Sequence, residues 1–415
     1  MIKINNIRRA ASLMILSGFF FLSSCNKALE EFAVIPTPVY PTGLGIAATI
    51  AANPNDSLYS RLIVRSGLTA TLNDLTKTYT IFAVDNAGMK LFVTGASGGL
   101  VPPNAPDASF SAFIAGSLPV ASAAGIVQYN TIGQKFPFSS FPTIFPNYPL
   151  PSLIILDPTQ PFARMTISPA KGALTSYVNT TPFTTILDQP AANGIIHHTA
   201  SVVTPPTATL KTMIAAEPTL SYFRAAIARG DSGAVGLSKF DSLLNYGVTN
   251  MTVLAPIDAA MQPVLFGSIY GALLAQGVPA ATANTQATAL AATPAGFNVL
   301  PVTTVKGIVA YHILASLTSS TITPYQPNIR AFSVNFSSTP TFIKTLVNGS
   351  VAVHPGVSAQ ATFTGATVSS LKFTGLGTFP PGGAPFSGTP ATAIAMDKHA
   401  VNGVYHIINS VLLPQ

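Results

Sequence analysis

The stretch LPVTTVKGIVAYH, residues 300–312, has a second copy elsewhere in the chain. Residues 118–130 read LPVASAAGIVQYN, and seven of the thirteen positions are identical. The shared positions include the proline, the GIV run and the tyrosine. An apolar segment that recurs at this length is typical of duplicated structural units. The fold therefore depends on how far the duplication extends along the chain.

Three further blocks recur in the same order. IAANP (50–54) returns as IAAEP (214–218), TIFAVDNAGM (80–89) as TVLAPIDAAM (252–261), and NGIIH (193–197) as NGVYH (402–406). Along the chain the offsets between paired blocks are 164, 172, 182 and 209. A preserved order with growing offsets predicts two homologous domains, residues 45–205 and 207–415, the second with longer loops. We call them the first and the second copy.

Local patterns within the blocks indicate a mixture of strands and helices. Residues 80–83 and 252–255 are short, apolar and β-branched, which predicts buried strands, and a further strand is expected over 407–413, closed by Pro414. Apolar residues at helical spacing follow both IAANP and IAAEP. Asp258 is expected to cap a helix after the break at Pro256. The added segments 271–297 and 373–392 are interpreted as elaborated loops.

The dipeptides Asn193-Gly194 and Asn402-Gly403 stand just before predicted strands in the two copies. Asparagine and glycine both tolerate positive φ, so each pair is expected to supply a turn.

Taken together, the blocks resemble those of a fasciclin-type domain. The segments that carry the resemblance are TLKTMIAAEPTLSYFRAAIARGD (209–231), TVLAPIDAAM, KGIVAYHIL (306–314) and VNGVYHIINSVLLP (401–414), and the first copy follows the same pattern. The resemblance covers nearly all of the chain after residue 24. It implies an α+β fold of two tandem fasciclin-like domains, each a β-sandwich wedge with short packed helices, used mainly in cell-surface adhesion.

The N-terminus, MIKINNIRRAASLMILSGFFFLSSC, has the pattern of an export signal. Three basic residues precede an apolar stretch (10–22) that is too short to span a bilayer as a mature helix. LSSC at 22–25 resembles a bacterial lipobox, which implies a signal peptide over 1–24, lipidation of Cys25 and a tether over 25–44. Asn26 after the cysteine implies the outer membrane, with exposure to the periplasm or to the cell surface left open.

The composition argues against several functional classes, including nucleic-acid binding and thiolate metal sites. The net charge of +7 includes Lys3, Arg8 and Arg9, and without them 17 basic residues face 13 acidic ones. No basic cluster remains, so no nucleic-acid partner is expected. Cys25 is the single cysteine, which excludes an internal disulfide or a thiolate metal site after that residue. Only 8% of residues are charged, which suits a strand-rich extracytoplasmic protein.

Histidines are the main candidates for chemistry. His197 and His406 follow Asn-Gly in both copies, which indicates a structural ring hydrogen bond, with a shared ligand role as the alternative. His197 and His198 are neighbours in a predicted strand, so they point to opposite faces and are not expected to share a metal. No catalytic motif is present, so we expect no enzyme activity, cofactor or metal.

Tyr311-His312 differs from its counterpart Tyr129-Asn130, because asparagine can replace a neutral imidazole as a hydrogen-bond partner but cannot take up a proton. The apolar residues on both sides of the pair indicate burial, so Tyr311 and His312 are expected to be structural, as are Tyr129 and Asn130. The alternative follows from the resemblance: in fasciclin-type domains a Tyr-His pair is implicated in contact with adhesion receptors, which makes Tyr311 and His312 candidate partner contacts.

The Asp-Ser-Leu tripeptides at 56–58 and 241–243 resemble acceptors for O-glycosylation in some Gram-negative bacteria, although Asp56-Ser57 is also typical of a helix cap.

These observations predict a lipid-anchored envelope protein that binds an extracellular protein or matrix partner through fasciclin-like domains. The alternative is a carbohydrate-binding surface lipoprotein for polysaccharide capture, with its site in the long loops of the second copy. A hydrolase is a third reading, for which no carboxylate pair or Ser-His-Asp set can be nominated.

Overall fold

The computed structural model describes residues 40–143, 149–172, 175–314, 329–349, 356–375 and 390–413, and Thr42–Gln415 form one unit. The predicted signal peptide, Cys25, most of the tether and most of segment 373–392 lie outside the described residues. Helices and several sheets are both present, in agreement with the expected α+β class.

The helices and strands of the first copy cover residues 46–199. Its α-helices are α2 (Ile46–Ala51), α3 (Ser57–Ser66), α4 (Thr69–Leu72), α5 (Asn86–Ala96), α6 (Asp107–Ala112) and α7 (Val120–Tyr129), with short helical turns η1 (Pro54–Asp56), η2 (Phe113–Ser117) and η3 (Phe138–Ser140). Its strands are β1 (Tyr79–Val84), β2 (Thr131–Ile132), β3 (Leu150–Ile155), β4 (Arg164–Ile167), β5 (Pro169–Lys171), β6 (Ser176–Val178), β7 (Thr181–Pro182), β8 (Gln189–Ala191) and β9 (Gly194–Thr199).

The second copy repeats this order with longer helices. Its α-helices are α8 (Leu210–Ala216), α9 (Ser221–Gly230), α10 (Phe240–Asn245), α11 (Asp258–Ala275), α12 (Ala280–Ala291) and α13 (Val302–Tyr311), with turns η4 (Pro218–Leu220), η5 (Gly236–Ser238), η6 (Pro294–Val299), η7 (Ser333–Asn335) and η8 (Leu346–Gly349). Its strands are β10 (Met251–Pro256), β11 (Ile313–Leu314), β12 (Thr341–Ile343), β13 (Val357–Thr364), β14 (Thr367–Thr374), β15 (Ala391–Ala400) and β16 (Gly403–Ile408).

In both copies the first strand pairs in parallel with the last strand. The sheet orders are β4-β3-β2-β1-β9-β8 and β11-β10-β16-β15-β14-β13-β12, and β5-β6-β7 form a separate three-stranded sheet. Thr80 of β1 lies opposite Ile195 and Ile132, and Thr252 of β10 lies opposite Val404 and Leu314. The duplicated blocks therefore occupy the same register in both sheets.

The predicted strands 80–83 and 252–255 are confirmed as β1 and β10, both buried throughout. The residues of these strands are apolar in succession because both faces of each strand are packed against a hydrophobic core, as is usual for parallel strands. In β1, Ile81 and Ala83 pack in one cluster and Phe82 in another. The strand expected at 407–413 was wrong in its bounds, since β16 covers Gly403–Ile408.

The Asn-Gly pairs have a different physical role from the one we expected, because neither member of either pair has positive φ. The Asn193 amide accepts from Ile46 N (2.9 Å) and donates to Leu72 O (2.9 Å), and it is 2% exposed. Asn402 binds Leu210 N and Leu244 O in the same way. Each asparagine is thus a buried link from the last strand to the first helix of its copy.

The glycine of each pair is required by a close approach of two backbones. A Cβ at Gly194 would overlap Tyr79 O, and one at Gly403 would overlap Met251 O, each on the neighbouring parallel strand. The turn that the sequence indicated is present, since residues 192–193 and 401–402 join antiparallel strands, but the glycine is required by this steric limit and not by positive φ.

Asp258 also acts on a different helix from the expected one. Its carboxylate accepts from Ser221 Oγ (2.7 Å) and Tyr222 N (2.8 Å), so it caps the N-terminus of α9, while α11 has no side-chain cap. The counterpart Asn86 accepts from Leu58 N (2.9 Å) at the start of α3.

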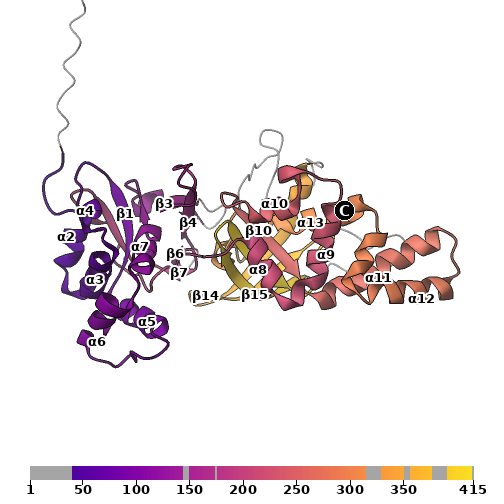
Figure 1. Cartoon of the computed structure of the whole chain (residues 1–415), viewed down its shortest axis with the longest axis horizontal. Coiled ribbons are helices and arrows are strands. Elements are labelled where there is room, and N and C mark those ends of the chain that lie inside the picture. Colours follow the sequence, from indigo (N-terminus) through magenta and orange to yellow (C-terminus); the bar gives the residue numbers. More distant parts are fainter. Residues whose placement is uncertain are drawn as a thin grey trace, which may run out of the picture. The chain divides into compact units, whose positions relative to one another are not determined.

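Segment 271–297 is helical, so our interpretation of it as a loop was wrong. The end of α11 and all of α12 lie side by side (Figure 1). Ala283, Ala287 and Ala291 form the buried stripe of α12 at a spacing of four residues. Alanine has the highest helix propensity, and its small side chain permits close packing of the two helices.

Among the described residues, no single helix combines the length and hydropathy that crossing a membrane requires. The bent pair Asp107–Ser117 and Val120–Tyr129, with an angle of 105° between its helices, meets both criteria only when the two are taken together.

We expect Gly194→Ala and Gly403→Ala to lower the free energy of unfolding by about 1–3 kcal/mol each, because the added methyl group displaces a paired strand. Thermal unfolding of the purified protein measures the effect. Gly125→Ala in α7 is the control, since nothing lies within 4 Å of a Cβ at that position. It should be neutral or stabilising by about 0.5–1 kcal/mol. Equal melting temperatures for Gly194→Ala and Gly125→Ala would contradict this account.

Candidate functional site

Tyr311 and His312 end helix α13 inside the second copy, and both side chains are 0% exposed. Tyr311 Oη donates to Gly356 O (2.8 Å). His312 Nδ1 donates to Ile308 O (2.8 Å), and its Nε2 accepts from Leu412 N (2.9 Å). With no exposed surface on either side chain, direct contact with a partner is not available to this pair in the structure.

Tyr129 and Asn130 occupy the same place at the end of α7. Tyr129 Oη donates to Thr166 O (3.1 Å), again a backbone carbonyl. The Asn130 amide donates to Ile126 O (2.9 Å) and to Val203 O (2.8 Å). Val203 and Leu412 occupy matching positions, the same number of residues after the last strand of each copy. In both copies the end of this helix is therefore hydrogen-bonded to the backbone that follows the last strand. His312 and Asn130 use different hydrogen-bonding atoms for this tie.

His197 and His406 form matching hydrogen bonds in the two copies. The Nδ1 of each ring accepts from a backbone N–H, of Asp188 (3.2 Å) and of Asp397 (3.3 Å). The Nε2 of each donates to a carbonyl oxygen, of Phe136 and of Ala331, both at 3.0 Å. The two aspartates have φ of 54° and 59°, in the left-handed region. Both nitrogens of each ring are therefore used within the fold.

Burial shifts the pKa values of these histidines downward. The pKa of His312 is lowered from 6.5 to about 4 because the buried ring cannot be solvated when charged, although the contact with Ile308 O opposes the shift. Burial also lowers the pKa of His197 and of His406. These rings are neutral at physiological pH, and their hydrogen bonds require the neutral form.

His198 forms a buried pair that the sequence did not reveal. Its Nε2 lies 3.0 Å from Asp56 Oδ2, and both side chains are 1% exposed. Asn53 Nδ2 also donates to this carboxylate oxygen (2.8 Å). In the second copy Leu220 and Ile407 take the two positions, so the pair belongs to the first copy alone.

A second unpredicted group lies where the two copies meet. Arg330 is 1% exposed, and its guanidinium donates to Thr166 O (3.3 Å) of the first copy, to Val401 O (2.7 Å) and to His399 Nε2 (3.3 Å). Burial lowers the pKa of Arg330 to about 10 and the pKa of His399 well below its usual value, and it raises the pKa of Tyr129 to about 12. Tyr177 Oη adds a donor to Ala366 O (2.6 Å). The junction is thus held by hydrogen bonds to backbone carbonyls.

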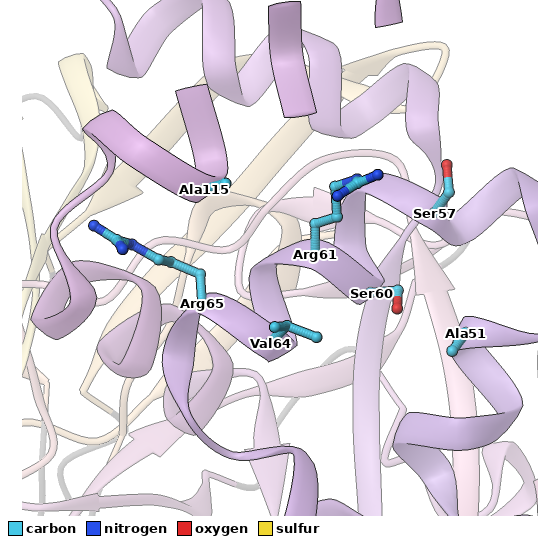
Figure 2. Close-up of a pocket in the computed structure, with 7 residues that line it drawn as sticks. All are labelled: Ala51, Ser57, Ser60, Arg61, Val64, Arg65 and Ala115. Atoms are coloured by element: carbon cyan, nitrogen blue, oxygen red, sulfur yellow. The ribbon is translucent and has the colours of Figure 1, made fainter. Parts of the chain in front are cut away.

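A pocket of about 570 Å³ lies on helix α3 (Figure 2). Four of its lining residues, Ser57, Ser60, Arg61 and Arg65, present hydroxyl or guanidinium groups, and the rest are Ala51, Val64 and Ala115. Arg65 is turned toward Ala115 in Figure 2, and its Nε donates to Leu118 O (2.8 Å). Arg229 Nε donates to Leu300 O (2.9 Å) in the second copy, so this arginine is a structural feature of both.

The Asp-Ser-Leu tripeptides and the expected cap at Asp56 can also be located in the structure. Ser57 is exposed and Ser242 partly exposed, so both Asp-Ser-Leu serines reach solvent. Asp56 caps no helix through its side chain, because its carboxylate is engaged by His198. Within the described part of the chain, no three His, Cys, Asp or Glu side chains gather as metal ligands would.

Comparisons with known proteins add little. No protein-family model matches the chain, and no curated protein matches it. One similar solved structure is described as "Novel Fold Revealed by the Structure of a FAS1 Domain Pair from the Insect Cell Adhesion Molecule Fasciclin I". It has 12% sequence identity and a TM-score of 0.30, over 86% of this chain and 96% of that chain. At this TM-score the similarity supports no argument, so the fasciclin resemblance rests on the duplicated blocks.

We expect the stability of the second copy to fall below pH 6.5 through His312. The unfolded ring takes up a proton near pH 6.5 and the folded ring only near pH 4, so stability is complete above pH 6.5 and is lost between these values. By pH 5 the loss is about 2 kcal/mol. His312→Asn, which copies Asn130, should reduce the loss of stability between pH 7.5 and pH 5, as measured by denaturant unfolding. An unchanged pH dependence in this variant would contradict the assignment.

Tyr311→Ala should lower the free energy of unfolding by about 3–5 kcal/mol, because it removes a fully buried aromatic ring. Tyr311→Phe keeps the ring and should cost about 1 kcal/mol, through loss of the bond to Gly356 O. Melting of both variants separates packing from hydrogen bonding. An unaffected melt for Tyr311→Ala would show that the ring is not packed in solution.

Proposed function

We propose that the protein is a lipid-anchored component of the cell envelope that binds an extracellular protein or matrix partner through two fasciclin-like domains. The observation that carries the proposal is the duplication, in which four sequence blocks recur in order and the same buried hydrogen bonds recur with them. Modules repeated in this way are typical of proteins that display surfaces to partners. The LSSC motif supports lipid attachment through Cys25, and Asn26 after the cysteine supports the outer membrane as its location.

The use of the polar side chains also supports a binding role. The imidazoles of His197, His312 and His406 each make two hydrogen bonds within the fold, and His198 is paired with Asp56. A general base or nucleophile must instead reach a substrate. Since Tyr311 and His312 are buried, the partner-binding surface is proposed to lie on exposed residues.

The alternative function, carbohydrate binding, now has a different candidate site. Segment 271–297 is helical and not a loop, and most of segment 373–392 lies outside the described residues. The pocket on α3, which carries hydroxyl and guanidinium groups, is the feature that favours ligand binding by the first copy.

The proposal is tested in the native cell. Mass spectrometry should find acyl chains on Cys25, and membrane fractionation should place the protein in the outer membrane. Deletion of the gene should weaken attachment of cells to surfaces or to one another, and wild-type protein should restore it. Cys25→Ser, which removes the thiol that carries the acyl chain, should not restore it. If the protein were found in the cytosol or the inner membrane, display on the outer membrane would be ruled out. If deletion of the gene left cell attachment unchanged, the adhesive function would be ruled out.

A further inference from the structure

We propose that the pocket on α3 binds a small ligand through one oxyanion group, a carboxylate or a sulfate ester, on an otherwise uncharged polar carrier. The proposal does not depend on the adhesive function. It rests on three features of the first copy, namely a guanidinium that the fold does not use, a lining without carboxylates, and a difference between the copies at two adjacent positions.

The free guanidinium belongs to Arg61. Among the residues that the structure describes, no hydrogen bond or ion pair engages its side chain, which is exposed at the pocket. Figure 2 shows Arg61 extending away from Arg65, on the side where Ser57 lies. A planar guanidinium binds a carboxylate or sulfate through two parallel N–H donors, which makes Arg61 the main contact for an oxyanion.

The rest of the lining suits an anion on a polar carrier. Ser57, Ser60, Arg61 and Val64 lie three or four residues apart along α3, so they share one helix face. The lining contains two arginines and no acidic residue, so the local charge is positive although Arg65 uses two of its nitrogens on Leu118 O and Gly116 O. The Ser60 hydroxyl has no hydrogen-bond partner within the described residues and can donate to the ligand. The volume lies within the range of small-molecule pockets.

The second copy has neither the unbonded guanidinium nor the small serine at the matching positions. Arg224 replaces Ser60, and its Nη1 donates to Ile214 O (3.2 Å) and Glu217 O (2.6 Å). Ala225 replaces Arg61. The second copy thus uses an arginine to satisfy its own backbone at this helix face, whereas the first copy has a small serine there and a free arginine beside it.

This comparison supplies the variants for the test. Ser60→Arg introduces the side chain that the second copy already carries, and it should bond to Ile50 O and Asn53 O and fill the pocket. Arg61→Ala introduces the second copy's alanine and removes the free charge while leaving the pocket open. Lys135→Ala removes one exposed positive charge of the same copy outside the pocket and is the matched control.

The experiment is calorimetric titration of the purified full-length protein and its variants at low salt. The probes are methyl glucuronide, methyl glucoside 6-sulfate, neutral methyl glucoside and inorganic sulfate. We expect the wild type to bind the glucuronide or the sulfate ester, and to bind neutral glucoside at least about tenfold more weakly, since one charge-assisted bond accounts for such a factor. Preference between the two charged glycosides identifies the oxyanion.

Arg61→Ala and Ser60→Arg should each weaken binding by about tenfold or more, with Lys135→Ala unchanged. Equal binding of the neutral glucoside, or binding that Arg61→Ala leaves intact, would overturn the proposal. Binding of inorganic sulfate alone would mean an adventitious ion only, and would overturn it too. If Ser60→Arg fails to fold, Arg61→Ala decides the outcome by itself. None of these results bears on attachment of cells, which tests the adhesive function separately.

Discussion

The structure of each copy depends on the parallel pairing of its first strand with its last. The first strand follows three α-helices and the last strand lies near the end of the copy, so the pairing encloses most of the copy. A loop of that length is costly to close, and the cost is offset only when the strands are buried on both faces. The Asn-Gly pair stands where this closure begins. Glycine allows the strands to approach, and the asparagine amide joins the last strand to the first helix.

The histidines support the same closure and are not free for other chemistry. His197 and His406 project from the last strands, and their Nε2 atoms bond to Phe136 O and Ala331 O, well outside those strands. Because both ring nitrogens are engaged only in the neutral form, protonation would break a buried hydrogen bond and place an unsolvated charge in the core. Retention of this histidine in two diverged copies is therefore explained by stability alone.

The sequence was sufficient to predict the duplication and the central strands, since burial on two faces leaves a short apolar run that can be recognised directly. The sequence was not sufficient to predict the role of a residue whose type suits both a local turn or cap and a contact with a distant part of the chain. Asn-Gly is usual in turns, and a turn is present at each pair, yet the pair is required by contacts with distant helices and a distant strand and not by positive φ. Asp258 is the first residue of α11 but caps α9. Segment 271–297 was interpreted as a loop because it is absent or shorter in the first copy, although its alanine content and the four-residue spacing of Ala283, Ala287 and Ala291 favour a helix.

Buried polar groups such as Asp56, His198 and Arg330 could not be located from the sequence, because their partners are far away along the chain. The comparison of the copies nevertheless explains why the first two are tolerated. Leu220 and Ile407 occupy their positions in the second copy and belong to its main core. A buried polar pair loses solvation about as much as it gains from its hydrogen bond, so an apolar pair of similar size is an equivalent solution. Once both solutions sustain the same sheet register, the copies are free to diverge at such sites and at surface positions such as Ser60 and Arg61. Differences between the copies, rather than their shared residues, are consequently where binding specificity is to be sought.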